Sequence, residues 1–306
     1  MDYVIFTAEK IKKIKIQGAK AIAVASLFSL KKASAGFKGS PRAYLLKIKK
    51  DIKILSFARP TEPLTVNCLK YVLRQLSFND HKDLQGLRAV LNSAADYLLK
   101  TIDLGEQKII STGERLIKKG NNVLTHCHSS TVENILKQAY QRGRFKVFNT
   151  ETRPLFQGRV MAKNLRQAGV DITMVEDSAA TFLLSDFLGK DLTMDLVIIG
   201  ADAIMPDGSA VNKIGSFGIS LAAHNEKIPV YIAAHLLKMD DNGLIPIEIR
   251  SSAEVWPNKP QGLKIINFAF DKIPAKNITG FICEFGLIKP KNLKSLVKKH
   301  YPWIFK

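Results

Sequence analysis

The chain has 306 residues, of which 46% are hydrophobic and 24% are charged, and its formal net charge is +19. This balance is typical of a globular protein and excludes intrinsic disorder, and no apolar run reaches the roughly 18 residues that a membrane-spanning helix needs. The length favours two domains, while three cysteines far apart and a start without a signal-peptide pattern predict a cytoplasmic protein without disulfides.

Residues 1–118 have the pattern of a helical N-terminal domain. Residues 19–30 are rich in strong helix formers, and amphipathic stretches with helical spacing lie within 87–117. Two interruptions break the pattern, at Gln17-Gly18-Ala19 and at Arg59-Pro60-Thr61. A residue before proline prefers an extended backbone, so we expect both interruptions to form polar loops at the rim of this domain.

From about residue 119 the pattern changes to short β-rich runs that alternate with helices. Most of these runs are apolar throughout, as strands of a parallel sheet that is buried on both faces are. The sequence therefore predicts an α/β protein, in which an N-terminal helical domain (1–118) is followed by a Rossmann-like open parallel sheet domain (119–306). No G-x-G-x-x-G motif follows a strand, which argues against a dinucleotide site. The predicted strands are 123–125, 145–148, 172–175, 196–199 and 230–233, and the predicted crossover helices are 131–142, 158–168 and 177–185.

Two of the predicted strands end in residues suited to acid–base chemistry. Cys127 follows the first strand and precedes a helix, whose positive end favours a thiolate, and Asp202 follows the fourth strand. Ligands of such sheets bind beyond the carboxyl ends of the strands, so the two side chains are expected to face one crevice. The structural alternatives are a buried, inert cysteine and an aspartate that caps the turn after its strand.

His126 and His128 flank this cysteine. Alternation along an extended chain points both histidines to the face opposite Cys127, and no further ligand follows at a metal-binding spacing. We therefore expect no metal and no other cofactor, and at most a charge or a hydrogen bond from a histidine. After the fourth strand, Asn212-Lys213 offers an amide and an ammonium that suit a sugar hydroxyl or a phosphate.

The positive charge is concentrated in the helical part, where residues 1–60 hold 14 Lys and Arg against three acidic residues. A solvated, lysine-rich surface explains this charge most simply. RNA is an alternative partner, but no RNA-recognition motif accompanies the charge, so we expect neither nucleic acid nor membrane as a partner. A field of this sign also attracts a small phosphorylated substrate.

Taken together, several strings resemble the family that unites aldose-phosphate isomerases with the regulatory subunits of translation initiation factor 2B. They follow the family order across nearly the whole chain. Gln17 stands where the family has arginine, which removes one cation from the expected phosphate cradle, and Lys20 is a candidate replacement. The strings are Gln17-Gly-Ala19, Ala58-Arg-Pro-Thr61, Thr125-His-Cys-His-Ser129, Thr150-Glu-Thr-Arg-Pro154, Gln157-Gly158, Gly200-Ala-Asp202, Val211-Asn-Lys-Ile-Gly215 and Phe268-Ala-Phe-Asp271.

The resemblance implies a working isomerase, because the initiation-factor subunits typically lack both the cysteine and the aspartate. His-Cys-His-Ser, in place of His-Cys-Asn, looks like the branch that converts ribose 1,5-bisphosphate into ribulose 1,5-bisphosphate in AMP catabolism. The alternatives are a methylthioribose-1-phosphate isomerase and a non-catalytic regulatory subunit. The resemblance also implies a homo-oligomer, either a dimer or a hexamer, with AMP as a candidate activator.

In this interpretation Cys127 and Asp202 are the catalytic residues. Asp202, kept protonated by its apolar strand end, donates a proton to the ring oxygen, and the Cys127 thiolate removes the proton on C2. A hydride shift from C2 to C1 is the alternative. The implied substrate-binding residues are Gln17, Gly18, Ala19, Lys20, Arg59, Ser129, Ser130, Thr131, Gln157, Asn212, Lys213 and Lys238.

Overall fold

The computed structural model describes residues 2–78, 83–189, 191–241, 243 and 248–305. The chain divides into two compact units. The helical unit comprises Met1–Leu104, Leu237–Asp241 and Ser295–Lys306, and the sheet unit comprises Gly105–Leu236 and Asn242–Lys294. Among the described residues, no helix is long and apolar enough to cross a membrane.

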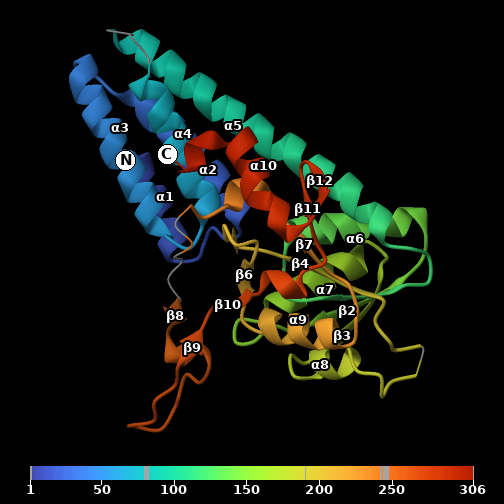
Figure 1. Cartoon of the computed structure of the whole chain (residues 1–306). Coiled ribbons are helices and arrows are strands. Elements are labelled where there is room, and N and C mark those ends of the chain that lie inside the picture. The colour runs from blue at the N-terminus through green and yellow to red at the C-terminus, as the bar shows by residue number, and fades with distance from the viewer. Residues whose placement is uncertain (1, 79–82, 190, 242, 244–247, 306) are drawn as a thin grey trace. The chain divides into compact units, whose positions relative to one another are not determined.

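Helices α1 to α4 and most of α5 form the helical unit (Figure 1). The side chains of Asp2 and Ser40 cap α1 and α3, and prolines occupy the first turns of α3 and α4, where a missing N–H costs nothing. The two predicted interruptions fall just before α2 and between α3 and α4. The helices are α1 (Tyr3–Lys12), α2 (Ala19–Gly36), α3 (Pro41–Ala58), α4 (Pro63–Ser77), α5 (Leu84–Gly113) and, near the end of the chain, α10 (Leu293–His300).

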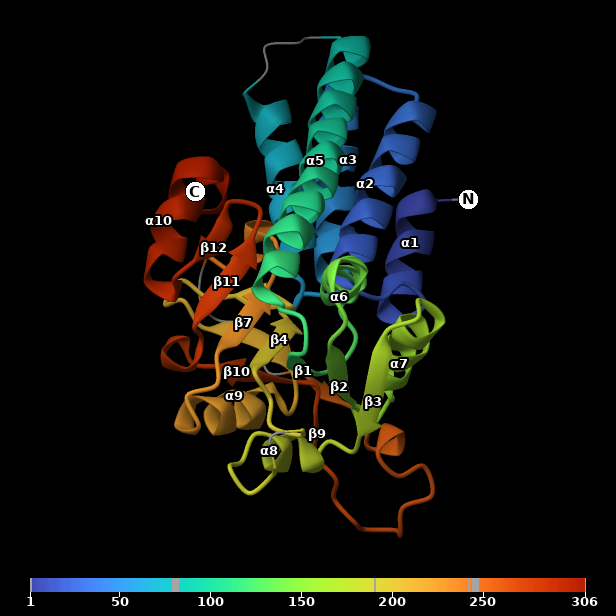
Figure 2. The same cartoon turned by 90° about the vertical axis from the view of Figure 1, so that its right-hand side faces the viewer.

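The sheet unit is built on a seven-stranded sheet with the order β12-β11-β7-β4-β1-β2-β3 (Figure 2). Neighbouring strands are parallel except at one edge, where β12 runs antiparallel to β11. This arrangement confirms the predicted fold class. Its strands are β1 (Asn122–Thr125), β2 (Lys146–Thr150), β3 (Asp171–Val175), β4 (Leu196–Gly200), β7 (Val230–Ala233), β11 (Gly280–Cys283) and β12 (Gly286–Ile288), and the helices between them are α6 (Ser130–Arg142), α7 (Gln157–Gln167), α8 (Ala179–Leu183) and α9 (Ser216–Asn225).

The central strands are buried on both faces, as their apolar sequences predict. Every residue of β1 and of β4 is buried. Strand β3 differs, because it lies at the edge of the sheet and has no buried residue. The core of this unit is formed by side chains of β1, β2, β4, α6 and α7, which include Val123, Leu136, Val147, Met161 and Ile198.

Several short strands were not predicted from the sequence. The most important belong to a three-stranded sheet, β10-β6-β5, in which all neighbours are antiparallel. Its register places Asp271 of β10 opposite Asn212 of β6. The strands of this sheet are β5 (Ala203–Ile204), β6 (Ala210–Lys213) and β10 (Phe270–Ile273), and a separate pair is formed by β8 (Ile249–Arg250) and β9 (Asn267–Phe268).

Two helical glycines give a matched test of this packing. A Cβ at Gly158 on α7 would lie 1.8 Å from the backbone oxygen of Thr150, whereas a Cβ at Gly218 on α9 would meet nothing within 4 Å. We expect Gly158→Ala to lower the free energy of unfolding by at least about 3 kcal/mol, because backbone atoms must shift. Gly218→Ala should raise it by up to about 1 kcal/mol, as helix propensity alone predicts. Urea unfolding of both variants measures the difference, and equal stabilities would contradict the close approach of α7 to β2.

Candidate active site

Cys127 lies at the turn between β1 and α6, in the sheet unit. Its φ of 67° is in the left-handed region, which residues other than glycine rarely adopt. The Cys127 N–H donates a hydrogen bond of 3.0 Å to Thr152 Oγ1, and the residue is 9% exposed. Two residues later, the Ser129 side chain caps α6 by accepting a hydrogen bond from the Val132 N–H. The predicted strand–turn–helix junction is therefore present.

The electrostatic environment of Cys127 differs from the expectation. Burial raises the pKa of its thiol to about 11, while the positive charge of Lys213 opposes this rise. The negative charges of Asp202 and Asp177 raise the pKa further. The prediction that the helix start favours a thiolate is therefore wrong for this environment, because desolvation of the sulfur outweighs the charge of Lys213 and the hydrogen bond from the His128 N–H.

Asp202 follows β4 and is partly buried. Its backbone N–H donates to the Val211 carbonyl at 2.9 Å, which joins the strand end to β6. Two residues earlier, a Cβ at Gly200 would lie 2.8 Å from Ser129 Oγ, so the ends of β4 and β1 approach closely. The charge of Asp202 acts on the Cys127 thiol. The structure thus brings the two predicted catalytic groups into one environment.

Lys213 and Asn212 end β6. The Lys213 ammonium lies 4.8 Å from the centre of the Phe270 ring, a cation–π contact that orients it. Asn212 is buried, and its amide donates to Ser216 Oγ at 2.8 Å. Ser216 Oγ in turn donates to the Lys213 carbonyl. Asn212 therefore braces the turn that carries Lys213, in addition to any contact with a sugar hydroxyl.

Gln157 begins α7, directly after Phe156, whose φ is 55°. Its Oε1 atom is buried and has no hydrogen-bond partner among the described residues. An orphaned buried acceptor calls for a donor, and a sugar hydroxyl is such a donor. At the start of α6, Ser130 and Thr131 present backbone N–H groups in the first turn, which is a favourable place for an anion.

The two histidines that flank Cys127 form hydrogen bonds with different partners. His126 is buried, and its ring nitrogens lie 2.6 Å from Thr150 Oγ1 and 2.8 Å from the Ile214 carbonyl oxygen. Burial lowers the pKa of His126, which keeps the imidazole neutral. His128 Nε2 lies 2.8 Å from Glu133 Oε2. In the described part of the chain, no three or more His, Cys, Asp or Glu residues are grouped so that they could hold a metal ion.

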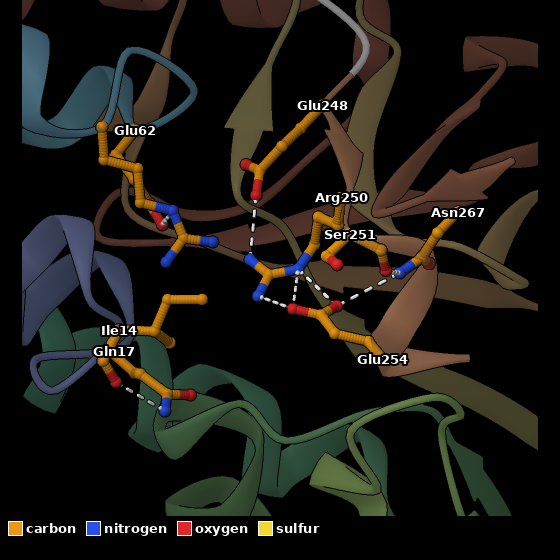
Figure 3. Close-up of polar contacts among 9 residues, drawn as sticks. Ile14, Gln17, Glu62, Glu248, Arg250, Ser251, Glu254 and Asn267 are labelled. Atoms are coloured by element: carbon orange, nitrogen blue, oxygen red, sulfur yellow. Dashed lines mark hydrogen bonds and ion pairs between the residues drawn. The ribbon is translucent and has the colours of Figure 1, made fainter. Parts of the chain in front are cut away.

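The remaining predicted binding residues belong to the helical unit. Gly18, with φ 84°, precedes Ala19 at the start of α2 without a side-chain cap. The Gln17 amide donates to the Ile14 carbonyl at 2.9 Å (Figure 3). Lys20 forms an ion pair of 2.8 Å with Asp103, so its ammonium has a carboxylate partner within the helical unit.

Arg59 and Lys238 also lie in the helical unit. Arg59 ends α3, and its Nε lies 3.7 Å from Glu62 Oε1 in the loop before α4. Glu62 belongs to the Glu62-Pro63 stretch that follows the Arg-Pro-Thr string. Lys238 ends a short 3₁₀ turn at Leu236–Lys238.

A charged cluster around Arg250 was missed by the sequence analysis. The Arg250 guanidinium contacts Glu254 on one side and Glu248 on the other, and Asn267 donates to Glu254 Oε2 at 3.1 Å (Figure 3). These bonds, above all that from Arg250, lower the pKa of Glu254, and Lys213 contributes to the same shift. The cluster is therefore within electrostatic reach of Lys213. Arg250 lies on the two-residue strand β8, so no periodic pattern signals the cluster in the sequence.

Asp271 is a second residue whose role the sequence did not reveal. Its Oδ2 accepts a hydrogen bond of 2.7 Å from the Gly215 N–H, and its Oδ1 is buried without a partner among the described residues. Burial raises the pKa of Asp271 to about 6, although the amides of Phe217 and Gly215 oppose the rise. This carboxylate holds the turn between Lys213 and α9.

The opposing effect of Lys213 on Cys127 can be tested by alkylation. The rate of iodoacetamide modification follows the thiolate fraction, so it should rise with pH toward the thiol pKa of about 11. We expect Lys213→Met to slow the reaction at pH 9 by up to about tenfold, because the favourable charge is lost. Peptide mass spectrometry measures the rate at Cys127. Lys163→Met, an exposed site on α7, is the control, and equal slowing in both variants would contradict a local effect.

The raised pKa of Asp271 predicts a pH-dependent stability. Its folded-state value of about 6 lies above the value of about 4 in an unfolded chain, so its contribution is greatest below pH 4 and declines as the pH rises to 6. The free energy of unfolding of the native protein, relative to Asp271→Asn, should therefore fall across this range. Urea unfolding between pH 4 and 7 measures it. Asp186→Asn, at an exposed position, should show no such trend.

Comparison with known proteins gives consistent matches along the chain. A family model described as the Initiation factor 2 subunit family matches residues 15–290. The ribose 1,5-bisphosphate isomerase of Methanocaldococcus jannaschii is 36% identical, over 100% of this chain and 98% of its own. The methylthioribose-1-phosphate isomerase of Pelotomaculum thermopropionicum is 32% identical, over 95% of this chain and 85% of its own. The crystal structure of the Pyrococcus horikoshii OT3 translation initiation factor eIF-2B has a TM-score of 0.81 at 25% identity, over 95% of this chain and 98% of that one.

Proposed function

Because the chain belongs to the initiation factor 2 subunit family, in which similar proteins are named isomerases, we propose that it converts ribose 1,5-bisphosphate into ribulose 1,5-bisphosphate. The observation that carries this proposal is the shared environment of Cys127, Asp202 and Lys213 beyond the strands of the parallel sheet. A thiol, a carboxyl group and an ammonium there suit an acid, a base and an anionic substrate.

The proposed reaction begins with ring opening, because phosphate on the anomeric oxygen prevents a free aldehyde from forming. The Asp202 carboxylic acid donates a proton to the ring oxygen, and the bond between C1 and this oxygen breaks. The Cys127 thiolate then removes the proton on C2, which leaves an enol. Cys127 returns that proton to C1, and the C2 hydroxyl gives its proton to Asp202, so both groups end as they began.

The charges around Cys127 bear on its proposed role as the base. The negative charge of Asp202 raises the pKa of the Cys127 thiol, so a thiolate forms more readily when Asp202 is the protonated acid that the proposed reaction needs. Lys213 favours the form with the charge on sulfur, whereas burial favours the thiol. The thiolate that the reaction needs is therefore the minor form of Cys127, and the charge of Lys213 increases its population.

The two phosphates require positive charge and N–H donors. In the sheet unit, Lys213 and the first-turn amides of α6 at Ser130 and Thr131 provide them. In the helical unit, Arg59, Lys238 and the amides at Gly18 and Ala19 are the proposed donors. Gln157, with its orphaned Oε1, is proposed to accept a hydrogen bond from a sugar hydroxyl.

A methylthioribose-1-phosphate isomerase is the second candidate, because a protein of that name is 32% identical over most of this chain. That sugar carries one phosphate fewer, so it needs fewer cationic groups than the bisphosphate. A homo-oligomer, as a dimer or a hexamer, and activation by AMP in nucleotide breakdown remain predictions; a related structure is described as a tetrameric eIF2B-beta2-delta2 complex.

Turnover of both sugars by the purified protein tests the proposal. We expect ribulose 1,5-bisphosphate from ribose 1,5-bisphosphate, with a much lower kcat/KM for methylthioribose 1-phosphate. Cys127→Ser and Asp202→Asn should each lower kcat by about a thousandfold or more while KM changes little, because each removes a group that acts in the transition state.

The outcomes separate the candidates. A higher kcat/KM for methylthioribose 1-phosphate would favour the second isomerase. Binding of the bisphosphate without turnover would favour a regulatory subunit. Cys283→Ser is the matched control for the thiol, because Cys283 is also buried but ends β11, a strand that β7 separates from β4 in the sheet.

A further inference from the structure

A continuous chain of buried hydrogen bonds runs from the turn after Lys213 to the backbone of Cys127. The three side chains in its middle, those of His126, Thr150 and Thr152, are 0 to 2% exposed. The chain passes from the Ile214 carbonyl to His126, then to Thr150 and Thr152, and ends at the Cys127 N–H.

The direction of every bond follows from its end points. The Ile214 carbonyl only accepts, so His126 Nε2 carries the proton and donates at 2.8 Å. The imidazole is neutral because burial lowers its pKa, so Nδ1 accepts from the Thr150 hydroxyl at 2.6 Å. Thr150 Oγ1 then accepts from the Thr152 hydroxyl at 3.2 Å, and Thr152 Oγ1 accepts from the Cys127 N–H at 3.0 Å.

At the far end, the peptide group between Ile214 and Gly215 is held from both sides. Its carbonyl accepts from His126, and its N–H donates to Asp271 Oδ2 at 2.7 Å. A carboxylate on the N–H polarises the peptide and makes its carbonyl a better acceptor. Gly215, with φ 105°, also keeps the approach open, because a Cβ there would lie 3.2 Å from the His126 ring.

At the Cys127 end, the hydrogen-bond chain includes two residues whose backbone lies in the left-handed region. Cys127 has a φ of 67° and Thr152 a φ of 63°. Asp177 fixes the second by accepting hydrogen bonds of 2.7 Å from the N–H groups of Thr152 and Arg153. Such conformations persist only where surrounding contacts impose them, and they are frequent at active sites.

We propose that His126 is a positioning residue that holds the Cys127 backbone and the Lys213 turn in one fixed frame. Through Thr150 and Thr152 it maintains the conformation that aims the Cys127 side chain, and through Ile214 it maintains the turn that carries the opposing ammonium. The hydrogen-bond chain stands on its own geometry, whereas its effect on turnover rests on the proposed isomerase function.

Thr150 offers the sharpest test, because it is the middle link and is not one of the proposed catalytic or substrate-binding residues. Thr150→Val keeps the shape of the side chain and removes the hydroxyl, whereas Thr150→Ser keeps the hydroxyl. We expect Thr150→Val to lower kcat for ribose 1,5-bisphosphate by about tenfold or more with KM within about twofold. The reason is that the orientation of the Cys127 side chain matters for the transition state and not for substrate binding. Thr150→Ser should stay within about threefold of the native kcat.

Alkylation of Cys127 gives a readout that needs no substrate. A Cys127 released from its fixed conformation becomes more exposed, so its pKa falls toward the ordinary value and iodoacetamide reacts faster. At pH 9 we expect Thr150→Val to react at least about fivefold faster than the native protein, and Thr150→Ser at the native rate. Thermal unfolding confirms that the variants are folded, and His126→Asn, which loses the bond to the Ile214 carbonyl, replaces Thr150→Val if that variant is not.

The two readouts separate this proposal from the proposed function. If the native protein does not turn over ribose 1,5-bisphosphate, the isomerase assignment fails, and the alkylation rates alone decide on His126. Native alkylation rates in folded Thr150→Val and His126→Asn would overturn the positioning role. So would a native kcat in Thr150→Val, or losses of kcat that are equal in Thr150→Val and Thr150→Ser.

Discussion

The parallel pairing of β1 with β4 is the constraint on which the candidate site depends. Val123 is paired with Leu196 and Leu124 with Val197, so both strands deliver the residues that follow them to one edge of the sheet. The glycine at the end of β4 leaves room only for a hydrogen atom beside Ser129. Because of this close approach, a charge on Asp202 acts on the thiol of Cys127. The two groups proposed as base and acid thus come from segments about 75 residues apart.

Burial and the charge of Lys213 act on the pKa of Cys127 in opposite directions. The sheet that brings the groups together also removes the sulfur from water, and the resulting desolvation raises the pKa of Cys127 to about 11. Lys213 is the nearby cation that works against this effect. It reaches its place through the small antiparallel sheet, in which β10 pairs with β6, and through its contact with Phe270. The pKa of Cys127 thus depends on both sheets. The large sheet buries the sulfur, which raises the pKa, and the small sheet places Lys213, whose charge lowers it.

The small sheet also explains why polar groups far from the sulfur matter. Asp271 comes from β10, about 140 residues after Cys127, yet it binds the peptide that His126 contacts on its other side. The carboxylate is costly to bury, as its raised pKa shows, and its Oδ1 has no hydrogen-bond partner in the described part of the protein. A buried polar group of this kind is retained where it fixes one geometry that an apolar side chain would leave open.

The sequence by itself determined the fold class and five of the seven strands of the large sheet, because continuous apolar runs between helical patterns have few other solutions in an α/β protein. It also determined which strand ends carry the cysteine and the aspartate. Only the tertiary structure decided the protonation of Cys127, since desolvation depends on everything packed around the sulfur. The short strands β5, β6 and β10, the cluster at Arg250 and the role of Asp271 were likewise decided there. Strands β6 and β10 contain polar residues and β5 has only two residues, so none of them is the continuous apolar run that marked the predicted strands. The partners of a buried polar group come from segments that only the folded chain brings together.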